Sequence, residues 1–213
     1  LDIKEFKLTM PTSINYLRHT ETFKFCLHEV GFKLFNRDIC NVVNLNCSIE
    51  EMTKNFSRNR RNEVKNAGKY NLVVNNNDSP EVFWKILDKT YKKHGVKPTH
   101  SLEELVYLNS KFPNEIYFDV AYHNDIPISG ICNFVLNKYV NSSFYLANDP
   151  KYRNIPSLKY LISNRLMLSI KEGYKFYDFG TTSTNGTANS NLFNFKEGFG
   201  SFGVLRETYL LKI

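Results

Sequence analysis

A few charged side chains stand where their type and neighbours favour chemistry. Asp178 ends the apolar segment 174–179, which predicts a strand, and ligands gather at strand ends in α/β sheets. Lys196 lies on a predicted loop beside Gly198 and Gly200, and glycines let a backbone approach a ligand closely. A carboxylate there can accept a proton, and a lysine can supply positive charge to an oxyanion. The alternative, purely structural interpretations are that Asp178 stabilises a turn and that Lys196 is an ordinary surface lysine.

Two histidines flank a turn that contains Gly95 and Pro98. A histidine whose pKa lies near neutrality is a natural general base. His94 falls in the last turn of a predicted helix, where the helix dipole favours a cation, so a structural role is the simpler interpretation. His100 precedes Ser101, a predicted helix cap, and is the histidine that we take as a candidate catalytic residue.

Arginines cluster in a basic segment near residue 60. Planar guanidinium groups suit phosphate, so Arg60 and Arg61 are candidates for holding a phosphate-bearing substrate. A solvated basic helix face is the simpler interpretation of the same residues.

A long polar segment, 180–194, predicts a loop, and a loop of this length is usually functional or mobile. Its Thr182, Ser183 and Asn189 are candidates for hydrogen bonds to a sugar or peptide. A flexible solvent-exposed loop would explain the same composition.

The elements that must position these groups follow from periodicity. Apolar positions predict a helix over 157–171, between strands over 142–148 and 174–179. A strand, a helix and a parallel strand form a crossover, which brings the helix start near Arg153 and Ser157 beside the end of the first strand. The free N–H groups and the dipole of a helix start favour a phosphate or pyrophosphate.

The remaining segments complete a mixed sheet. Residues 115–122 and 127–136 predict a hairpin, and residues 48–66 predict one basic helix that a capping box opens. The polar segment 75–79 is rich in turn formers and is the expected domain boundary. The order predicts an α/β (α+β) fold with a mixed, mostly antiparallel sheet flanked by helices.

This order of elements resembles that of the GNAT acyltransferases. Residues 195–200 (FKEGFG) and 177–180 (YDFG) are similar to motifs of the FemABX-like branch, which contains peptidoglycan-bridge aminoacyltransferases and related acyltransferases of polysaccharide biosynthesis. Residues 59–62 (NRRN) look like part of an N-terminal helix of that branch, and residues 94–100 resemble a segment of its acetyltransferase subgroup.

The resemblance covers the chain from about residue 20 onward. It implies an incomplete N-terminal GNAT-like subdomain over residues 1–76, with a basic helix, and a GNAT-like acyltransferase domain over residues 77–213. The chain opens on Leu1 with strand-like alternation, so we expect a partner for this strand upstream of the given sequence.

The implied activity is transfer of an acyl group, most simply acetyl from acetyl-coenzyme A or another acyl-coenzyme A, to the amine of an amino sugar or peptidoglycan-type precursor in the cytosol. Lys196 would polarise the carbonyl, with Asp178 or His100 assisting deprotonation. Coenzyme A would be held by Asn148, Arg153 and Ser157. The acceptor would be held by Arg60, Arg61, Thr182, Ser183 and Asn189.

The predicted pyrophosphate loop departs from the GNAT pattern. The stretch 153–158 contains no glycine, and Pro156 removes one N–H donor. Two alternatives therefore stay open. One is aminoacyl transfer from tRNA, which fits the basic first half of the chain. Residues 1–100 contain 17 Lys and Arg against 11 Asp and Glu, and the whole chain has a formal net charge of +7. The other is a non-catalytic binding module on the same fold.

Composition excludes several classes of protein. The chain of 213 residues has 42% hydrophobic and 23% charged residues, which is typical of globular proteins. No apolar run approaches the roughly 18 residues of a membrane span, so no membrane span is expected. Its four cysteines form no C-x-x-C pair and no zinc-ligand pattern, which predicts free thiols in the cytosol and no metal.

Overall fold

The computed structural model describes residues 3–93 and 95–213, so His94 lies outside the described residues. The helices are α1 (Thr22–Glu29), α2 (Ile49–Lys54), α3 (Arg58–Ala67), α4 (Pro80–Lys93), α5 (Leu102–Lys111), α6 (Ser157–Lys171) and α7 (Ser190–Glu197). The strands are β1 (Glu5–Thr9), β2 (Lys33–Asn44), β3 (Val73–Asp78), β4 (Ile116–His123), β5 (Ile126–Asn137), β6 (Val140–Asn148), β7 (Phe176–Thr181), β8 (Ser183–Thr184), β9 (Thr187–Ala188) and β10 (Phe202–Lys212).

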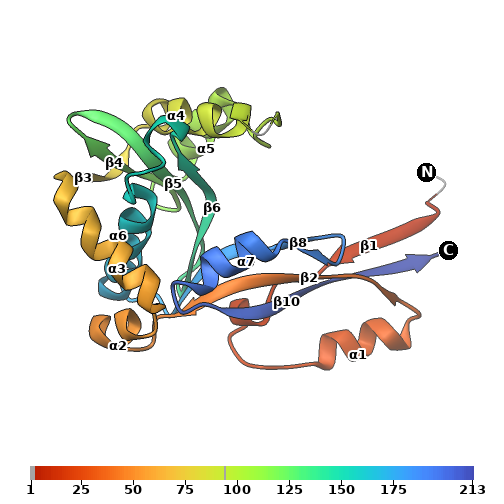
Figure 1. Ribbon diagram of the computed structural model, residues 1–213. Helices are drawn as coiled ribbons and strands as arrows, with labels where there is room; N and C mark the ends of the chain where they lie inside the picture. Colours follow the sequence, from red (N-terminus) through yellow and green to blue (C-terminus); the bar gives the residue numbers. More distant parts are fainter. Residues whose placement is uncertain (1–2, 94) are drawn as a thin grey trace.

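Eight of these strands form one sheet in the order β1-β10-β2-β7-β6-β5-β4-β3 (Figure 1). The described pairs are antiparallel except β6 with β7, which are the strands that α6 connects. The fold is therefore the expected mixed, mostly antiparallel sheet flanked by helices. The parallel register runs from Val140 opposite Phe176 to Ser142 opposite Asp178, and no further pairs join the two strands within the described residues.

Helices cover both faces of the sheet around β4 and β5. Along β4, Phe118 and Val120 pack with α4 and α5, whereas Ala121 packs with α6 on the opposite face. This alternation is the period of two that a strand imposes on its side chains. Buried Arg165 of α6 fixes that helix to the sheet through two hydrogen bonds of 2.7 Å to the carboxylate of Asp119.

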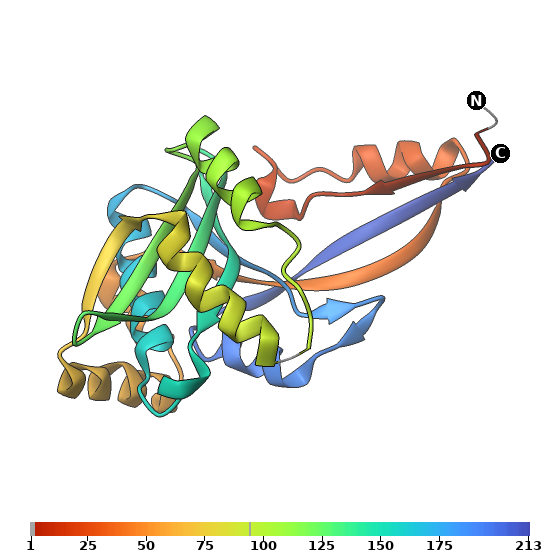
Figure 2. The same ribbon diagram turned by 90° about the horizontal axis from the view of Figure 1, so that it is seen from above.

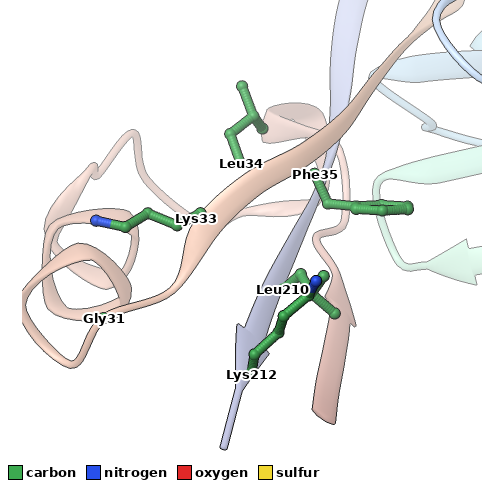
Figure 3. Close-up of a pocket in the computed structure, with 6 residues that line it drawn as sticks. All are labelled: Gly31, Lys33, Leu34, Phe35, Leu210 and Lys212. Carbon is green, nitrogen blue, oxygen red and sulfur yellow. The ribbon is translucent and has the colours of Figure 1, made fainter.

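An arm of three strands extends from the helix-covered part. It consists of β1, β10 and β2, with α1 alongside (Figures 1 and 2). A shallow groove of about 260 Å³ lies near the end of β10, and Phe35, Leu210 and Lys212 are among its lining residues (Figure 3). The groove contains none of the motif residues that the sequence indicates as functional.

The structure corrects three expectations about the elements. The basic segment 48–66 forms two helices, because Ser57 caps α3 by accepting a hydrogen bond from the backbone N–H of Arg60. Most of the polar segment 75–79 belongs to β3, which bulges at its left-handed Asn77 and gains its hydrogen bonds from β4. Segment 180–194 is ordered as the β8–β9 hairpin and the first part of α7.

The two-part division near residue 76 stays a prediction. Strands from both sides of that position alternate in the sheet, because β10 lies between β1 and β2, and β2 pairs with β7.

Candidate active site

A cleft of about 970 Å³ lies where β6 and β7 diverge. It is bounded by β5, β6 and β7, by β2 and β10 of the arm, by α4 and α7, and by the segment after β1. Three of its lining residues carry formal charge, namely Asp178, Lys196 and Arg206. The others include Pro11, Thr12, Asn15, Cys40, Tyr91, Leu136, Asn137, Ser142, Ser143, Phe144, Leu146, Phe179 and Leu192.

Lys196 lies in the last turn of α7, and not on a loop as the sequence predicted. Only 3% of the residue is exposed, and its Nζ donates to the carbonyl oxygens of Gly180 and Thr181, each at 3.0 Å. Burial lowers the pKa of Lys196 to about 8, although the charge of Asp178 opposes the shift. An ammonium has three N–H donors, so these two contacts leave one for a ligand.

The FKEGFG motif fixes this end of α7 against α2 and α3. The guanidinium of Arg60 donates to the carbonyl oxygen of Phe195 at 2.9 Å and lies 4.2 Å from the ring centroid of Phe199. Gly200 has a left-handed φ of +73°, and a Cβ there would come within 2.9 Å of the carbonyl oxygen of Asn55. The motif therefore positions Lys196 through its neighbours on both sides.

Asp178 lies in β7, beside the point where β6 and β7 part. Its carboxylate accepts a hydrogen bond of 2.7 Å from the backbone N–H of Gly180, and 6% of the residue is exposed. Burial raises the pKa of Asp178, whereas this hydrogen bond and the charges of Lys196 and Arg206 act in the opposite direction. A carboxylate with a raised pKa is a better proton acceptor than an exposed one.

Among the cleft residues that sequence reasoning missed, Cys40 and Arg206 bear most directly on the chemistry. Burial raises the pKa of the Cys40 thiol to about 12, so the thiolate form is scarce at neutral pH. Arg206 stands in a strand opposite Asp38, from which it is separated by 168 positions along the chain. A local pattern carries no signal for such a distant neighbour.

The third candidate catalytic residue, His100, does not line the cleft. Its Nδ1 lies 3.0 Å from the hydroxyl of Tyr145, and its ring centroid is 5.1 Å from that of Phe144. Phe144 does line the cleft. The structure therefore brings Lys196 and Asp178 together and places His100 behind an aromatic side chain.

The three residues expected at coenzyme A lie near the start of α6 and outside the cleft lining. Ser157 Oγ donates to Asn148 Oδ1 at 3.2 Å, so the crossover joins these two as predicted. The backbone N–H and carbonyl of Asn148 are both hydrogen-bonded to Thr90 Oγ1, at 3.1 and 3.0 Å. Arg153 is exposed and follows a short 3-10 turn, Pro150–Tyr152.

The five residues expected to bind the acceptor also lie outside the cleft lining, because other parts of the chain engage their side chains. Arg60 packs on the FKEGFG motif, as described, and Arg61 donates to the carbonyl oxygens of Lys54 and Phe56. These contacts hold α2, α3 and α7 together, which is a structural use of the basic cluster.

The polar residues of segment 180–194 have similar internal partners. Thr182 Oγ1 donates to Asn41 Oδ1 at 2.7 Å, and Ser183 Oγ donates to Asp38 Oδ1 at 2.7 Å. Asn189 caps α7 by accepting from the backbone N–H of Leu192 at 3.1 Å. These bonds order the segment and position the helix that carries Lys196.

The described residues hold no group of three or more His, Cys, Asp or Glu side chains with the geometry of a metal site. Within the same residues, no helix combines the length and apolar character that a bilayer crossing needs.

Comparisons with known proteins show the fold. No protein-family model and no curated protein matches the chain. Among solved structures, FemX superposes with a TM-score of 0.78 at 13% identity, over 99% of this chain and 72% of FemX. The C-terminal domain of a putative lysylphosphatidylglycerol synthetase from Agrobacterium fabrum gives 0.65 at 9% identity, over 86% of this chain and 62% of that one.

A GCN5-related N-acetyltransferase from Sphaerobacter thermophilus gives a TM-score of 0.53 at 9% identity, over 98% of this chain and 59% of that one. The chain thus spans less than two thirds of this protein and of the synthetase domain. At these identities the likeness concerns architecture alone. The chain has the FemABX-like GNAT fold that its motifs predicted.

Proposed function

We propose that the protein is an aminoacyltransferase that moves an aminoacyl group from tRNA to an amine of a peptidoglycan-type precursor in the cytosol. The observation that carries the proposal is buried Lys196 in the cleft at the β6–β7 divergence, with one N–H donor free of the chain. The likeness to FemX and to a lysylphosphatidylglycerol synthetase domain, together with the FKEGFG and YDFG motifs, supports this class of donor.

The cleft chemistry fits direct transfer. The neutral acceptor amine forms a C–N bond to the ester carbonyl, and the ammonium of Lys196 stabilises the resulting oxyanion. Asp178 takes the surplus proton of the amine. The ester C–O bond then breaks, and the ribose oxygen leaves with the proton that Asp178 returns. Since the thiol of Cys40 is held protonated by burial, transfer without an acyl-enzyme is the simpler route.

Coenzyme A is the competing donor. Two observations argue against it. The three residues expected to hold coenzyme A do not line the cleft, and two of them, Asn148 and Ser157, are hydrogen-bonded within the chain. In addition, Pro156 provides no N–H at the start of α6, where a pyrophosphate would be held.

Single-turnover assays distinguish the two donors. The protein is mixed with total tRNA charged with 14C-labelled amino acids, or with 14C-acetyl-coenzyme A, and with nucleotide-linked peptidoglycan precursors. We expect label in the precursor fraction from charged tRNA alone, and its loss with Lys196→Met. Label from acetyl-coenzyme A alone would replace the proposal with acetyl transfer. Label from neither donor would overturn the proposal in favour of a binding module.

A further inference from the structure

Arg206 is the charged residue of the cleft that the proposed reaction leaves unused. It lines the cleft with Asp178 and Lys196, and its side chain is exposed. No carboxylate of the described residues lies within 4.0 Å of its guanidinium. The neighbouring Arg37, in contrast, is tied to Glu207 at 2.6 Å. Arg206 therefore carries a cation into the cleft with no ion-pair partner in the described chain.

The expected partner of Arg206 is already engaged. Asp38 stands opposite it in the register of β2 and β10. The Asp38 carboxylate accepts hydrogen bonds from Ser183 Oγ at 2.7 Å, from Asn36 Nδ2 at 2.6 Å and from the backbone N–H of Gly186 at 3.1 Å. These donors hold the carboxylate against the β8–β9 hairpin, and the hydrogen bond from Ser183 lowers its pKa. The charge of Arg206 acts on Asp38 through space without a close contact.

The balance of charge in the cleft favours an anion. Its lining has two cations, Lys196 and Arg206, against one carboxylate, Asp178. The buried ammonium of Lys196 is fixed on two backbone carbonyls, whereas the Arg206 guanidinium is exposed and can reorient. A guanidinium offers two parallel N–H donors, which match the two oxygens of a carboxylate or phosphate.

We propose that Arg206 is the anion-binding residue of the cleft and holds a carboxylate or phosphate group of the substrate. The inference rests on the proposed function in treating this cleft as the substrate site. The anionic group belongs either to the acceptor or to the donor. In both cases Arg206 positions its substrate through binding, whereas Lys196 and Asp178 act on the reacting atoms.

Calorimetric titration tests the anion site without turnover. The probes are glutarate, for a carboxylate, and inorganic pyrophosphate, for a phosphate group. The variants are Arg206→Gln and Arg206→Lys. Lys212→Gln is the matched control, because it removes the same charge from an exposed position of the same strand, six residues or about 20 Å further along β10.

We expect at least one probe to bind wild type and Lys212→Gln equally. Arg206→Gln is expected to weaken that binding about tenfold or more, and Arg206→Lys to give an intermediate loss because an ammonium lacks the fork. Equal binding by Arg206→Gln and wild type would overturn the proposal, as would the absence of binding by both probes. Thermal unfolding of each variant establishes that it is folded.

Turnover separates this proposal from the proposed function and identifies the source of the anion. A higher KM for the precursor alone in Arg206→Gln assigns the anion to the acceptor, and a higher KM for charged tRNA alone assigns it to the donor. Anion binding that depends on Arg206, in a protein that transfers no aminoacyl group, would retain the site and overturn the proposed function. Aminoacyl transfer by Arg206→Gln with both KM values unchanged would retain the proposed function and overturn the anion site.

Discussion

Arg60 of α3 and Phe195 of α7 are joined twice. The guanidinium of Arg60 donates to the carbonyl oxygen of Phe195 at 2.9 Å, and its central carbon lies 4.7 Å from the centroid of the Phe195 ring. Because Lys196 is the next residue, an arginine that resembles a substrate ligand in the sequence instead fixes the backbone of the candidate catalytic lysine.

Substitution of this arginine should therefore impair stability and catalysis together. Arg60→Ala removes a buried charged hydrogen bond and two cation–π contacts, and we expect a loss of roughly 2–3 kcal/mol in the free energy of unfolding. Arg58→Ala is the matched control, because Arg58 is an exposed arginine of the same helix. Urea unfolding and kcat are measured for both. Equal stabilities of the two variants would contradict the structural role.

Activity should fall on the alkaline side as Lys196 loses its proton. The ammonium is the form that stabilises an oxyanion, and its pKa is about 8, so kcat should decline through pH 8. The charge of Asp178 supports the ammonium, hence Asp178→Asn should move this alkaline limb to lower pH as well as reducing kcat. A pH–rate profile of single turnovers measures both the rate and the position of the alkaline limb. An alkaline limb at the same pH in Asp178→Asn and wild type would disprove the electrostatic coupling of Asp178 and Lys196.

Lys196 should also make the free energy of unfolding depend on pH, and this effect can be measured without an activity assay. Its pKa is 10.5 in the unfolded chain and about 8 in the folded one, so the unfolded state binds more protons between these values. The cost of burying the ammonium is fully present below pH 8 and is lost as the pH rises toward 10.5. Relative to Lys196→Met, the free energy of unfolding of wild type should increase from pH 8 to pH 10. Parallel curves would place Lys196 in solvent.

Gly200 of the FKEGFG motif should tolerate no side chain. Gly200→Ala combines a left-handed φ with a Cβ that would lie 2.8 Å from Asn55 Cβ and 2.9 Å from its carbonyl oxygen. Gly173→Ala is the control, since Gly173 has a φ of +86° and no atom within 4 Å of the added Cβ. We expect Gly200→Ala to cost about 1–3 kcal/mol more than the control in thermal or urea unfolding. Equal losses of stability in the two variants would show that the left-handed φ alone, and not the contact with Asn55, sets the cost.

Local signals predicted much of the fold. The predicted capping box at Ser48 and the predicted cap Ser101 both mark real helix starts, and the hairpin turn falls at Asn124 and Asp125, both with positive φ. The β6–α6–β7 crossover also follows from periodicity, as its alternation of strand and helix is visible in the residues themselves.

The site was harder to predict because distant contacts decide it. Segment 180–194 has little apolar periodicity, so its order depends on Asp38 and Asn41 of β2, which bind Ser183 and Thr182. Asn189 was expected to bind substrate from a polar loop, and its polar neighbours masked the helix that it caps. Arg206 lies at the site because of the register between β2 and β10. Asp38, its cross-strand neighbour, instead accepts a hydrogen bond from Ser183, and no local sequence pattern predicts that contact.

The position of β10 has a consequence for how the molecule folds. This strand pairs with β1 and β2, so Lys212 meets Glu5 across some two hundred residues, whereas the β4–β5 hairpin closes locally. Contacts of such high sequence separation form slowly, because a long loop must close before they are gained. We therefore expect the arm wall of the cleft, with Arg206, to be completed after the helix-covered half. During synthesis β2 emerges before both of its sheet neighbours, and once β7 has paired with it, the other edge of β2 stays exposed until β10 is made.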